Sequence, residues 1–285
     1  MYVAPNINGS NECTHVGVAQ QMIVVNINPV LFSYGPLVIR WYGLMYAVGI
    51  TVGLIVIWPY AKIKGFTRDQ LDKIVYWSIP AGLVGARLYY VLQQPLEPYL
   101  KEPWRIFAFW EGGMAFYGAI FGVVITLFVL SIHLKLSIWN LLDITPLFAV
   151  VGQFFGRIGN FINGDIIGYP THQPWGVIYV NPNSLAPRHD IAYQPAAVFE
   201  AIIDIVLFTI LWFLRNRMRP GMLFFVYVFG YSFSQLLVFF LRDNEILLLG
   251  LKQAQLTAIV VMLITAVILV WFIKQQHHLN KVKTD

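Results

Sequence analysis

The chain has 285 residues, of which 58% are hydrophobic and only 12% are charged. This composition lies outside the usual range of soluble domains and is typical of a protein solvated by a lipid bilayer. The formal net charge of +5 does not indicate a nucleic-acid-binding protein, because the basic residues occupy short loops between apolar runs rather than one face. The single cysteine, Cys13, excludes an internal disulfide framework and a cysteine-based metal site.

Residues 1–35 precede the first long apolar run. They lack the basic start, the compact apolar stretch and the small-residue cleavage site that mark a removable signal peptide. We therefore expect this segment to form an amino-terminal arm on the outer membrane surface.

Apolar stretches of about 20 residues, the length that crosses the hydrocarbon core, recur along the rest of the chain. They predict an all-α integral membrane protein with about seven transmembrane helices in a single transmembrane domain, 36–273. The expected spans are 36–57, 73–93, 115–134, 138–158, 195–214, 221–241 and 254–273.

The loops between these spans form two sets that differ in their content of basic residues. The poorer set, near 94–114, 159–194 and 242–253, holds five Lys and Arg residues. The richer set holds eleven: Lys62, Lys64, Arg68, Lys73, Lys135, Arg215, Arg217, Arg219, Lys274, Lys281 and Lys283. The positive-inside rule places the richer set in the cytoplasm. We therefore expect the amino end outside, a small extracytoplasmic head region at about 159–194, and a cytoplasmic tail, 274–285.

Three arginines, Arg40, Arg87 and Arg157, lie within or at the edge of apolar spans. An arginine at membrane depth costs at least about 2.5 to 3.5 kcal/mol, so it usually faces a partner or a wet cavity. Arg87 is open to two interpretations, a functional residue or an anchor that reaches the headgroups. Arg40 precedes Trp41 and Tyr42, which is typical of an interfacial aromatic belt with a basic anchor.

A polar stripe surrounds Arg157 on the fourth expected span. Its members are spaced by four, three and four residues, which places them on one helix face: Gln153, Arg157, Asn160 and Gly164. Four glycines in the same stretch let the backbone bend or break at the membrane edge: Gly156, Gly159, Gly164 and Gly168. Such irregular backbone must line a cavity or be buried. The alternative is that Arg157 only ties helices together through Asp143 or Asp165.

Arginines at the rim of a cavity suit a phosphate, because guanidinium groups bind it bidentately and stabilise the charge on a departing phosphate. Phospholipid headgroups are the phosphates available at that depth. The sequence contains no His-Glu-x-x-His motif, Walker loop, paired dinucleotide glycines or Gly-x-Ser-x-Gly motif, which argues against a metalloprotease, an ATPase and a serine hydrolase. The six histidines are scattered, so we expect no metal site.

The stretch 156–168, which reads Gly-Arg-Ile-Gly-Asn-Phe-Ile-Asn-Gly-Asp-Ile-Ile-Gly, resembles the signature of the prolipoprotein diacylglyceryl transferase family. The resemblance extends from about Leu31 to Leu269. Further matching segments follow in the family's order: Ile39-Arg40-Trp41-Tyr42-Gly43-Leu44, Gly85-Ala86-Arg87, Trp110-Glu111-Gly112-Gly113-Met114, Asp143 with Pro146, Gln194-Pro195 with Phe199-Glu200, and Gln253 or Gln255.

The resemblance implies an enzyme of the bacterial plasma (inner) membrane, with 36–273 as its catalytic domain and its active site toward the extracytoplasmic side. Such an enzyme transfers the diacylglyceryl group from phosphatidylglycerol to the lipobox cysteine thiol of a preprolipoprotein signal peptide. A thioether forms and glycerol 1-phosphate leaves. Membrane lipids are the other expected partners, and the resemblance implies no cofactor, no metal and no nucleic acid.

The resemblance also implies roles for individual residues. Arg157 and Asn160 match positions that bind the headgroup, Arg87 matches a supporting position, and Tyr42 matches one that lines the site. We expect three further residues to contact substrate: Asn163, Gln235 and Arg242.

The chain departs from the family pattern at several of these positions. Tyr117 stands where well-studied members have His, and Asp165 stands where the signature usually has Glu. We therefore take Tyr117 and Asp165 as candidate proton-handling residues, with Arg157 stabilising the departing phosphate. Gln235 and Phe239 replace an Arg and a Glu, which leaves Arg242 as the nearest remaining cation.

Two other functions remain open from the residues alone. Broken helices with embedded arginines also build translocation sites, so a lipid or anion transporter is one alternative. The loss of charge at Gln235 and Phe239 prompts the other, a relative that binds lipid without catalysis.

Overall fold

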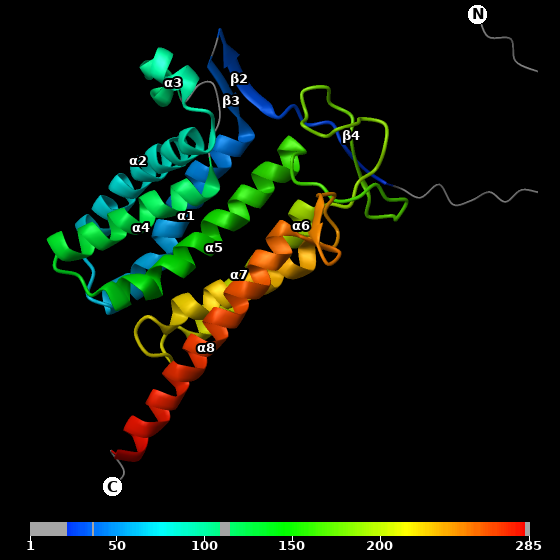
Figure 1. Cartoon of the computed structure of the whole chain (residues 1–285). Coiled ribbons are helices and arrows are strands. Elements are labelled where there is room, and N and C mark those ends of the chain that lie inside the picture. Colours follow the sequence, from blue (N-terminus) through cyan, green and yellow to red (C-terminus); the bar gives the residue numbers. More distant parts are fainter. Residues whose placement is uncertain (1–21, 36, 109–114, 283–285) are drawn as a thin grey trace, which may run out of the picture.

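The computed structural model describes residues 22–35, 37–108 and 115–282, and long helices dominate this part of the chain (Figure 1). Helices of 17 residues or more are α1 (Trp41–Ile63), α2 (Arg68–Gln93), α4 (Phe116–His133), α5 (Ile138–Asn163), α6 (Ala196–Leu214), α7 (Met222–Val238) and α8 (Gln253–Val282). A short helix, α3 (Glu97–Lys101), and a 3-10 helix, η1 (Pro103–Phe107), follow α2. Each expected span overlaps one of the long helices, so the mostly helical architecture is confirmed.

Short strands are a feature that the sequence reading did not predict. They form three two-stranded sheets: β1 (Ile23–Val25) parallel to β4 (Val177–Tyr179), β2 (Val30–Tyr34) antiparallel to β3 (Leu37–Arg40), and β5 (Ile246–Leu248) antiparallel to β6 (Leu251–Lys252). The expected all-α class describes the long helices and did not include these strands. Because residues 37–40 pair with β2, helix α1 begins at Trp41 rather than at residue 36. Residues 1–21 of the expected arm, with Cys13, lie outside the described residues.

Two ends of the bundle can be distinguished in Figure 1. We call the end that carries the loops 64–67, 134–137 and 215–221 the basic end, because most of the lysines and arginines of the richer set lie in or next to these loops. We call the end that carries the six strands and the 164–195 segment the strand end.

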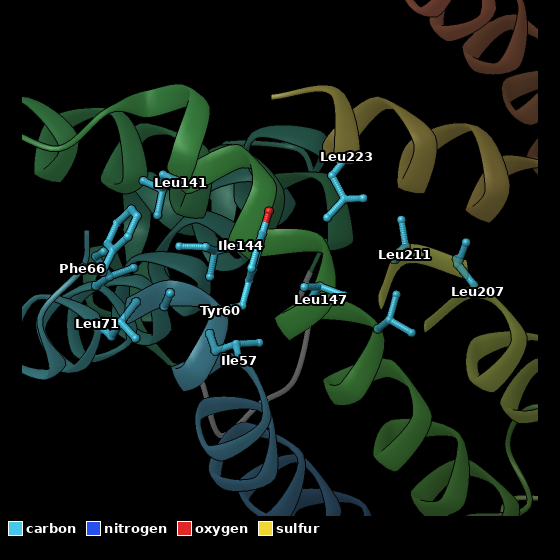
Figure 2. Close-up of a cluster of buried hydrophobic side chains, with 13 residues drawn as sticks. Ile57, Tyr60, Phe66, Leu71, Leu141, Ile144, Leu147, Leu207, Leu211 and Leu223 are labelled. Carbon is cyan, nitrogen blue, oxygen red and sulfur yellow. The ribbon is translucent and has the colours of Figure 1, made fainter. Parts of the chain in front are cut away.

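A core of buried apolar side chains joins α1, α2, α5, α6 and α7 toward the basic end (Figure 2). Its buried members are Ile57, Tyr60, Ala61, Phe66, Leu71, Ile74, Leu141, Ile144, Leu147, Val150, Leu207, Leu211 and Leu223. Close packing of this kind holds helices together inside a bilayer, where lipid tails remove much of the hydrophobic driving force.

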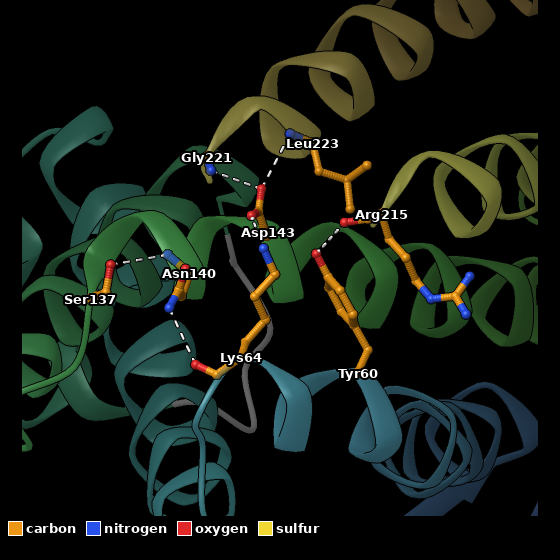
Figure 3. Close-up of polar contacts among 8 residues, drawn as sticks. All are labelled: Tyr60, Lys64, Ser137, Asn140, Asp143, Arg215, Gly221 and Leu223. Carbon is orange, nitrogen blue, oxygen red and sulfur yellow. Dashed lines mark hydrogen bonds and ion pairs between the residues drawn. The ribbon is translucent and has the colours of Figure 1, made fainter. Parts of the chain in front are cut away.

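Asp143 is a polar anchor within the same region (Figure 3). Its side chain is 1% exposed and accepts a hydrogen bond from Lys64 Nζ at 3.0 Å. Its other oxygen accepts the backbone N–H groups of Gly221 at 2.8 Å and Leu223 at 3.3 Å. A carboxylate at this place satisfies unpaired N–H groups at the start of α7 and complements the helix dipole. The carboxylate of Asp143 therefore binds groups at the basic end.

Glycines allow α2 and α4 to lie almost in backbone contact. A Cβ atom added to Gly118 would lie 2.3 Å from the carbonyl oxygen of Gly85, and one added to Gly122 would lie 2.2 Å from that of Ala81. Real side-chain atoms do not approach backbone this closely, so the pair depends on small residues, as helix contacts in membranes commonly do.

Helix α5 continues past its expected end at residue 158 and ends after Asn163. Gly164 stops it by adopting a left-handed conformation with φ 73°, and its N–H donates to the Asn160 carbonyl at 2.8 Å. The expected break in the backbone therefore comes at Gly164, not at Gly156 or Gly159. Those two glycines face α1 instead, where a Cβ atom at Gly159 would lie 3.0 Å from the Cα atom of Tyr42.

Among the described residues, four helical segments are long and apolar enough to cross a membrane: Trp41–Ile63, Ile138–Asn163, Ala196–Leu214 and Gln253–Gln275. Two shorter segments, Gly118–His133 and Met222–Val238, are also apolar. Large apolar side chains such as Ile55, Ile205 and Val267 are more than half exposed, which suits a lipid-facing surface. The helices are those of a multi-pass membrane protein.

Candidate functional site

Arg157 meets an acidic partner on a different helix. Its Nη2 atom lies 2.6 Å from Oε2 of Glu200 in the first turns of α6. The two side chains are 15% and 3% exposed. Neither of the carboxylates considered from the sequence is this partner, because Asp143 binds Lys64 and Asp165 binds side-chain amides. The Arg157 side chain therefore keeps a small exposed fraction although it pairs with a buried carboxylate.

A second guanidinium approaches Glu200 from beyond the end of α7. Arg242 Nη1 lies 3.7 Å from Oε1 of Glu200, and its side chain is 20% exposed. Burial lowers the pKa of Arg242, and the Glu200 carboxylate opposes this shift. One carboxylate therefore holds two arginines that lie far apart in the chain.

Each of these two arginines has one buried N–H donor that no described residue accepts. Within the described part of the chain, Nε of Arg157 and Nε of Arg242 are buried and have no hydrogen-bond partner. A buried donor without an acceptor is costly, which favours an acceptor supplied by a ligand. The arrangement can therefore bind an anion between two cations whose positions are set by Glu200.

Asp204 lies one helical turn further along α6 and carries a second buried carboxylate. It is 4% exposed, and its Oδ2 atom has no hydrogen-bond partner among the residues described. Asp204 and Tyr231 of α7 both lie near enough to Arg157 to interact with it electrostatically. The site therefore extends from the strand end into the bundle.

Asn160 and Asn163 together fix Asp165. The Asn160 Nδ2 atom donates to one carboxylate oxygen at 3.0 Å, and the Asn163 Nδ2 atom donates to the other at 3.2 Å. Both asparagines are 4% exposed, whereas Asp165 itself is exposed. Asp165 also lies near the Tyr179 phenol, whose pKa is raised by burial and then by this carboxylate, so the phenol stays protonated. The asparagines thus orient the first residue after Gly164.

Arg40 makes defined contacts beside its place next to Trp41 and Tyr42. Its Nη1 atom donates to Oδ1 of Asn163 at 3.0 Å and to the Asn183 carbonyl at 3.4 Å. It therefore connects strand β3 to the end of α5 and to the 164–195 segment.

Tyr42 lies within this group of charges. Gly159 lets α1 approach α5 at this residue, and Tyr42 lies in electrostatic reach of both Asp165 and Arg157. Its hydroxyl donates to the Tyr46 hydroxyl at 3.1 Å. Its position is consistent with lining the site.

Arg87 donates to backbone carbonyls of the segment that follows α2. Its side chain is 3% exposed, and it donates from Nε to the Ile106 carbonyl at 3.1 Å and from Nη2 to the Arg105 carbonyl at 2.6 Å. It points inward and ties α2 to η1, so it does not snorkel to the headgroups. The contacts described for it support a structural role.

The remaining candidates are placed only in part. Tyr117 lies in the first turn of α4, and its side chain lies outside the described residues. Gln235 lies on α7 and is partly buried. The motif 110–114 also lies outside the described residues. In the described part of the chain, no cluster of three or more His, Cys, Asp or Glu residues is placed to hold a metal ion.

Glu200 and Asp204 were not among the expected site residues, although both are central to the cluster. The signal was present, because two acids spaced by four residues inside the apolar run 195–214 lie on one helix face. Charge inside an expected membrane span should have marked α6 as a part of the site.

Comparison with known proteins identifies the family of the chain. The family model of prolipoprotein diacylglyceryl transferase matches residues 29–271. Several curated relatives bear the name phosphatidylglycerol–prolipoprotein diacylglyceryl transferase. The one from Rhizobium leguminosarum bv. trifolii is 34% identical over 232 residues, which cover 77% of this chain and 80% of the relative.

Two further relatives with the same name cover more of the chain. The Synechocystis sp. protein is 33% identical over 260 residues, or 88% of this chain and 91% of the relative. The Cupriavidus metallidurans protein is 36% identical over 261 residues, or 86% of this chain and 93% of the relative. Because the family model matches most of the chain and these relatives are at least 33% identical over most of it, the chain belongs to the prolipoprotein diacylglyceryl transferase family.

Proposed function

We propose that this protein transfers the diacylglyceryl group from phosphatidylglycerol to the lipobox cysteine thiol of a preprolipoprotein. The thiolate sulfur attacks the glyceryl carbon that bears the phosphate, so a carbon–sulfur bond forms and the carbon–oxygen bond breaks. Glycerol 1-phosphate leaves with the electron pair, and the thiol proton passes to a base on the protein. The names of the relatives support both substrates and the reaction class.

The observation that carries the proposal is the convergence of Arg157 and Arg242 on Glu200. Glu200 orients both guanidinium groups but leaves an Nε donor of each without a partner. A phosphodiester offers the acceptors that these donors lack, and fixed cations stabilise the charge that develops as phosphate departs. Electrostatic stabilisation of this kind is commonly the largest single contribution to catalysis.

The other site residues have supporting roles in this scheme. Asn160 contributes to headgroup binding and, with Asn163, holds Asp165 toward the thiol. Asp165 and Tyr117 handle the proton, because the thiolate rather than the thiol is the nucleophile. Tyr42 lines the site and Gln235 faces the lipid substrate. For Arg87 we now favour a structural role in place of direct support of the headgroup.

The membrane arrangement follows from the distribution of charge. We place all seven long helices across a bacterial plasma (inner) membrane, with the basic end in the cytoplasm and the strand end outside. Residues 1–35 then form the outer arm, 36–273 the catalytic domain with its head at about 159–194, and 274–285 the cytoplasmic tail. Phosphatidylglycerol and the signal peptide reach the site from the outer leaflet.

Complementation tests the proposed function. The gene is expressed in a bacterium depleted of its own transferase, and a reporter lipoprotein is analysed by mass spectrometry. The expected result is growth together with a diacylglyceryl thioether on the lipobox cysteine. Arg157→Ala should abolish both, whereas Arg188→Ala should preserve them, because Arg188 is exposed and pairs only locally with Asp190. An Arg157→Ala protein that retained full transfer would overturn the assignment, and an unmodified reporter with the unaltered protein would overturn the function.

A further inference from the structure

Lys252 is a buried cation to which the reaction scheme assigns no role. It is 5% exposed and lies in β6, immediately before α8. Its Nζ atom donates to the carbonyl oxygens of Phe239, at 2.6 Å, and of Arg242. The same ammonium lies 4.8 Å from the centre of the Tyr169 ring. An ammonium has three donors, and two carbonyls and a ring face account for them, so Lys252 binds protein rather than ligand.

Neighbouring contacts hold the same stretch of backbone. Gln255 is 1% exposed, accepts the Lys252 N–H at 3.0 Å and donates to the Leu236 carbonyl at 3.2 Å. On the other side, the Tyr169 N–H donates to the Leu241 carbonyl at 2.8 Å. Carbonyls at the end of a helix otherwise lack partners, and a cation suits the negative end of the helix dipole. These hydrogen bonds to backbone carbonyls form a clamp that fixes the position of residues 236–242.

This clamp matters because the side chain of Arg242 is held more loosely. Its ion contact to Glu200 is 3.7 Å long, and its guanidinium lies 4.6 Å from the centre of the Phe239 ring. Gln235 and Phe239, at the preceding positions on this segment, are uncharged. The direction in which Arg242 points therefore depends on where the backbone of residues 239–242 is fixed as well as on the contact with Glu200.

We propose that Lys252 is a positioning residue that holds the end of α7 so that Arg242 faces Glu200 and the lipid phosphate. The proposal rests on the proposed function, since it assigns Arg242 to the phospholipid substrate. Removal of the ammonium frees two carbonyls and lets Arg242 move away from the site. The effect should fall on lipid binding and not on the peptide substrate.

The test uses full-length protein purified in detergent, with labelled phosphatidylglycerol and a lipobox peptide as substrates. Lys252→Met should raise the KM for phosphatidylglycerol about tenfold and leave the KM for the peptide within twofold of the unaltered protein. Lys252→Arg should restore most of the lipid affinity, because it keeps a cationic donor. Lys101→Met is the matched control, since Lys101 is 72% exposed and pairs with Glu97, and it should change neither constant.

Hydrogen–deuterium exchange of residues 236–244 supplies a readout that does not depend on turnover. Exchange should rise in Lys252→Met and not in Lys101→Met. If Lys252→Met is not recovered as folded protein, Lys252→Gln replaces it with the same expected direction. An unchanged lipid KM with unchanged exchange would overturn the proposal, as would equal increases in both KM values or a fall in kcat alone. Absence of transfer by the unaltered protein would instead refute the proposed function.

Discussion

Glu200→Gln is the most direct test of the arginine cluster. The substitution keeps the shape of the side chain and removes the charge that faces Arg157 at 2.6 Å and Arg242 at 3.7 Å. Removing one partner of a buried pair typically costs about 3–5 kcal/mol, because the other charge remains buried. Arg157 is 15% exposed and the amide retains an acceptor oxygen. We therefore expect the loss of this charge to cost about 2–3 kcal/mol of interaction free energy with the two arginines.

This free energy predicts a measurable loss of activity. If Glu200 orients both arginines in the transition state, kcat/KM should fall by about 30-fold to 150-fold. The assay follows transfer of labelled diacylglyceryl to a lipobox peptide by purified enzyme. Glu97→Gln is the control, because Glu97 is 76% exposed and exposed pairs contribute only about 0–1 kcal/mol.

A double-mutant cycle separates the ion pair from unrelated damage. Arg157→Gln and Glu200→Gln contact each other, so the combined variant should lose less activity than the product of the two single losses. Losses that simply multiply would refute the coupling. A Glu200→Gln enzyme within twofold of the unaltered protein would refute the reasoning altogether.

Other residues give predictions that separate stability from chemistry. Gly118→Leu would force apart the contact with α2 and should destabilise the protein by about 3 kcal/mol, which a lower thermal midpoint would show. Gly43→Leu is the control, because a Cβ atom there meets no other atom within 4 Å, and it should leave the thermal midpoint unchanged. Asp143→Ala should lower the thermal midpoint, with a loss of about 3 kcal/mol, while the folded fraction keeps its specific activity. Asn160→Ala removes one donor from Asp165 and should reduce kcat about tenfold without a large change in thermal midpoint. Unchanged turnover in Asn160→Ala would contradict the role given to Asp165.

The positions of the long helices could be predicted from hydropathy, but their ends depended on contacts that hydropathy does not contain. Helix α1 begins at Trp41 instead of the expected residue 36 because residues 37–40 pair with β2. Helix α5 ends at Asn163 instead of the expected residue 158. Gly156 and Gly159 allow close contact with α1 and do not interrupt the helix. The strands have two to five residues, and β1 pairs with β4 far along the chain, so no local pattern predicts them.

The site residues expected from helical spacing lay on one helix only, although the acids of 195–214 were a second signal. Helical spacing placed Arg157 and Asn160 on one face of α5, and the structure brings Asp165 to Asn160 there. Spacing along one helix cannot say which residue of another helix lies opposite. Glu200 therefore remained without a role, although it is the residue that joins Arg157 to Arg242.

The cluster also bears on how the protein is made. Tyr42 comes from α1, Arg157 from α5, Glu200 from α6 and Arg242 from beyond α7, and Lys252 borders α8. A nascent chain that has inserted only the helices up to α5 therefore carries Arg157 without Glu200, its partner on α6. The ribosome must therefore deliver the chain as far as Arg242 before these side chains can come together, and a product terminated earlier would lack the complete cluster.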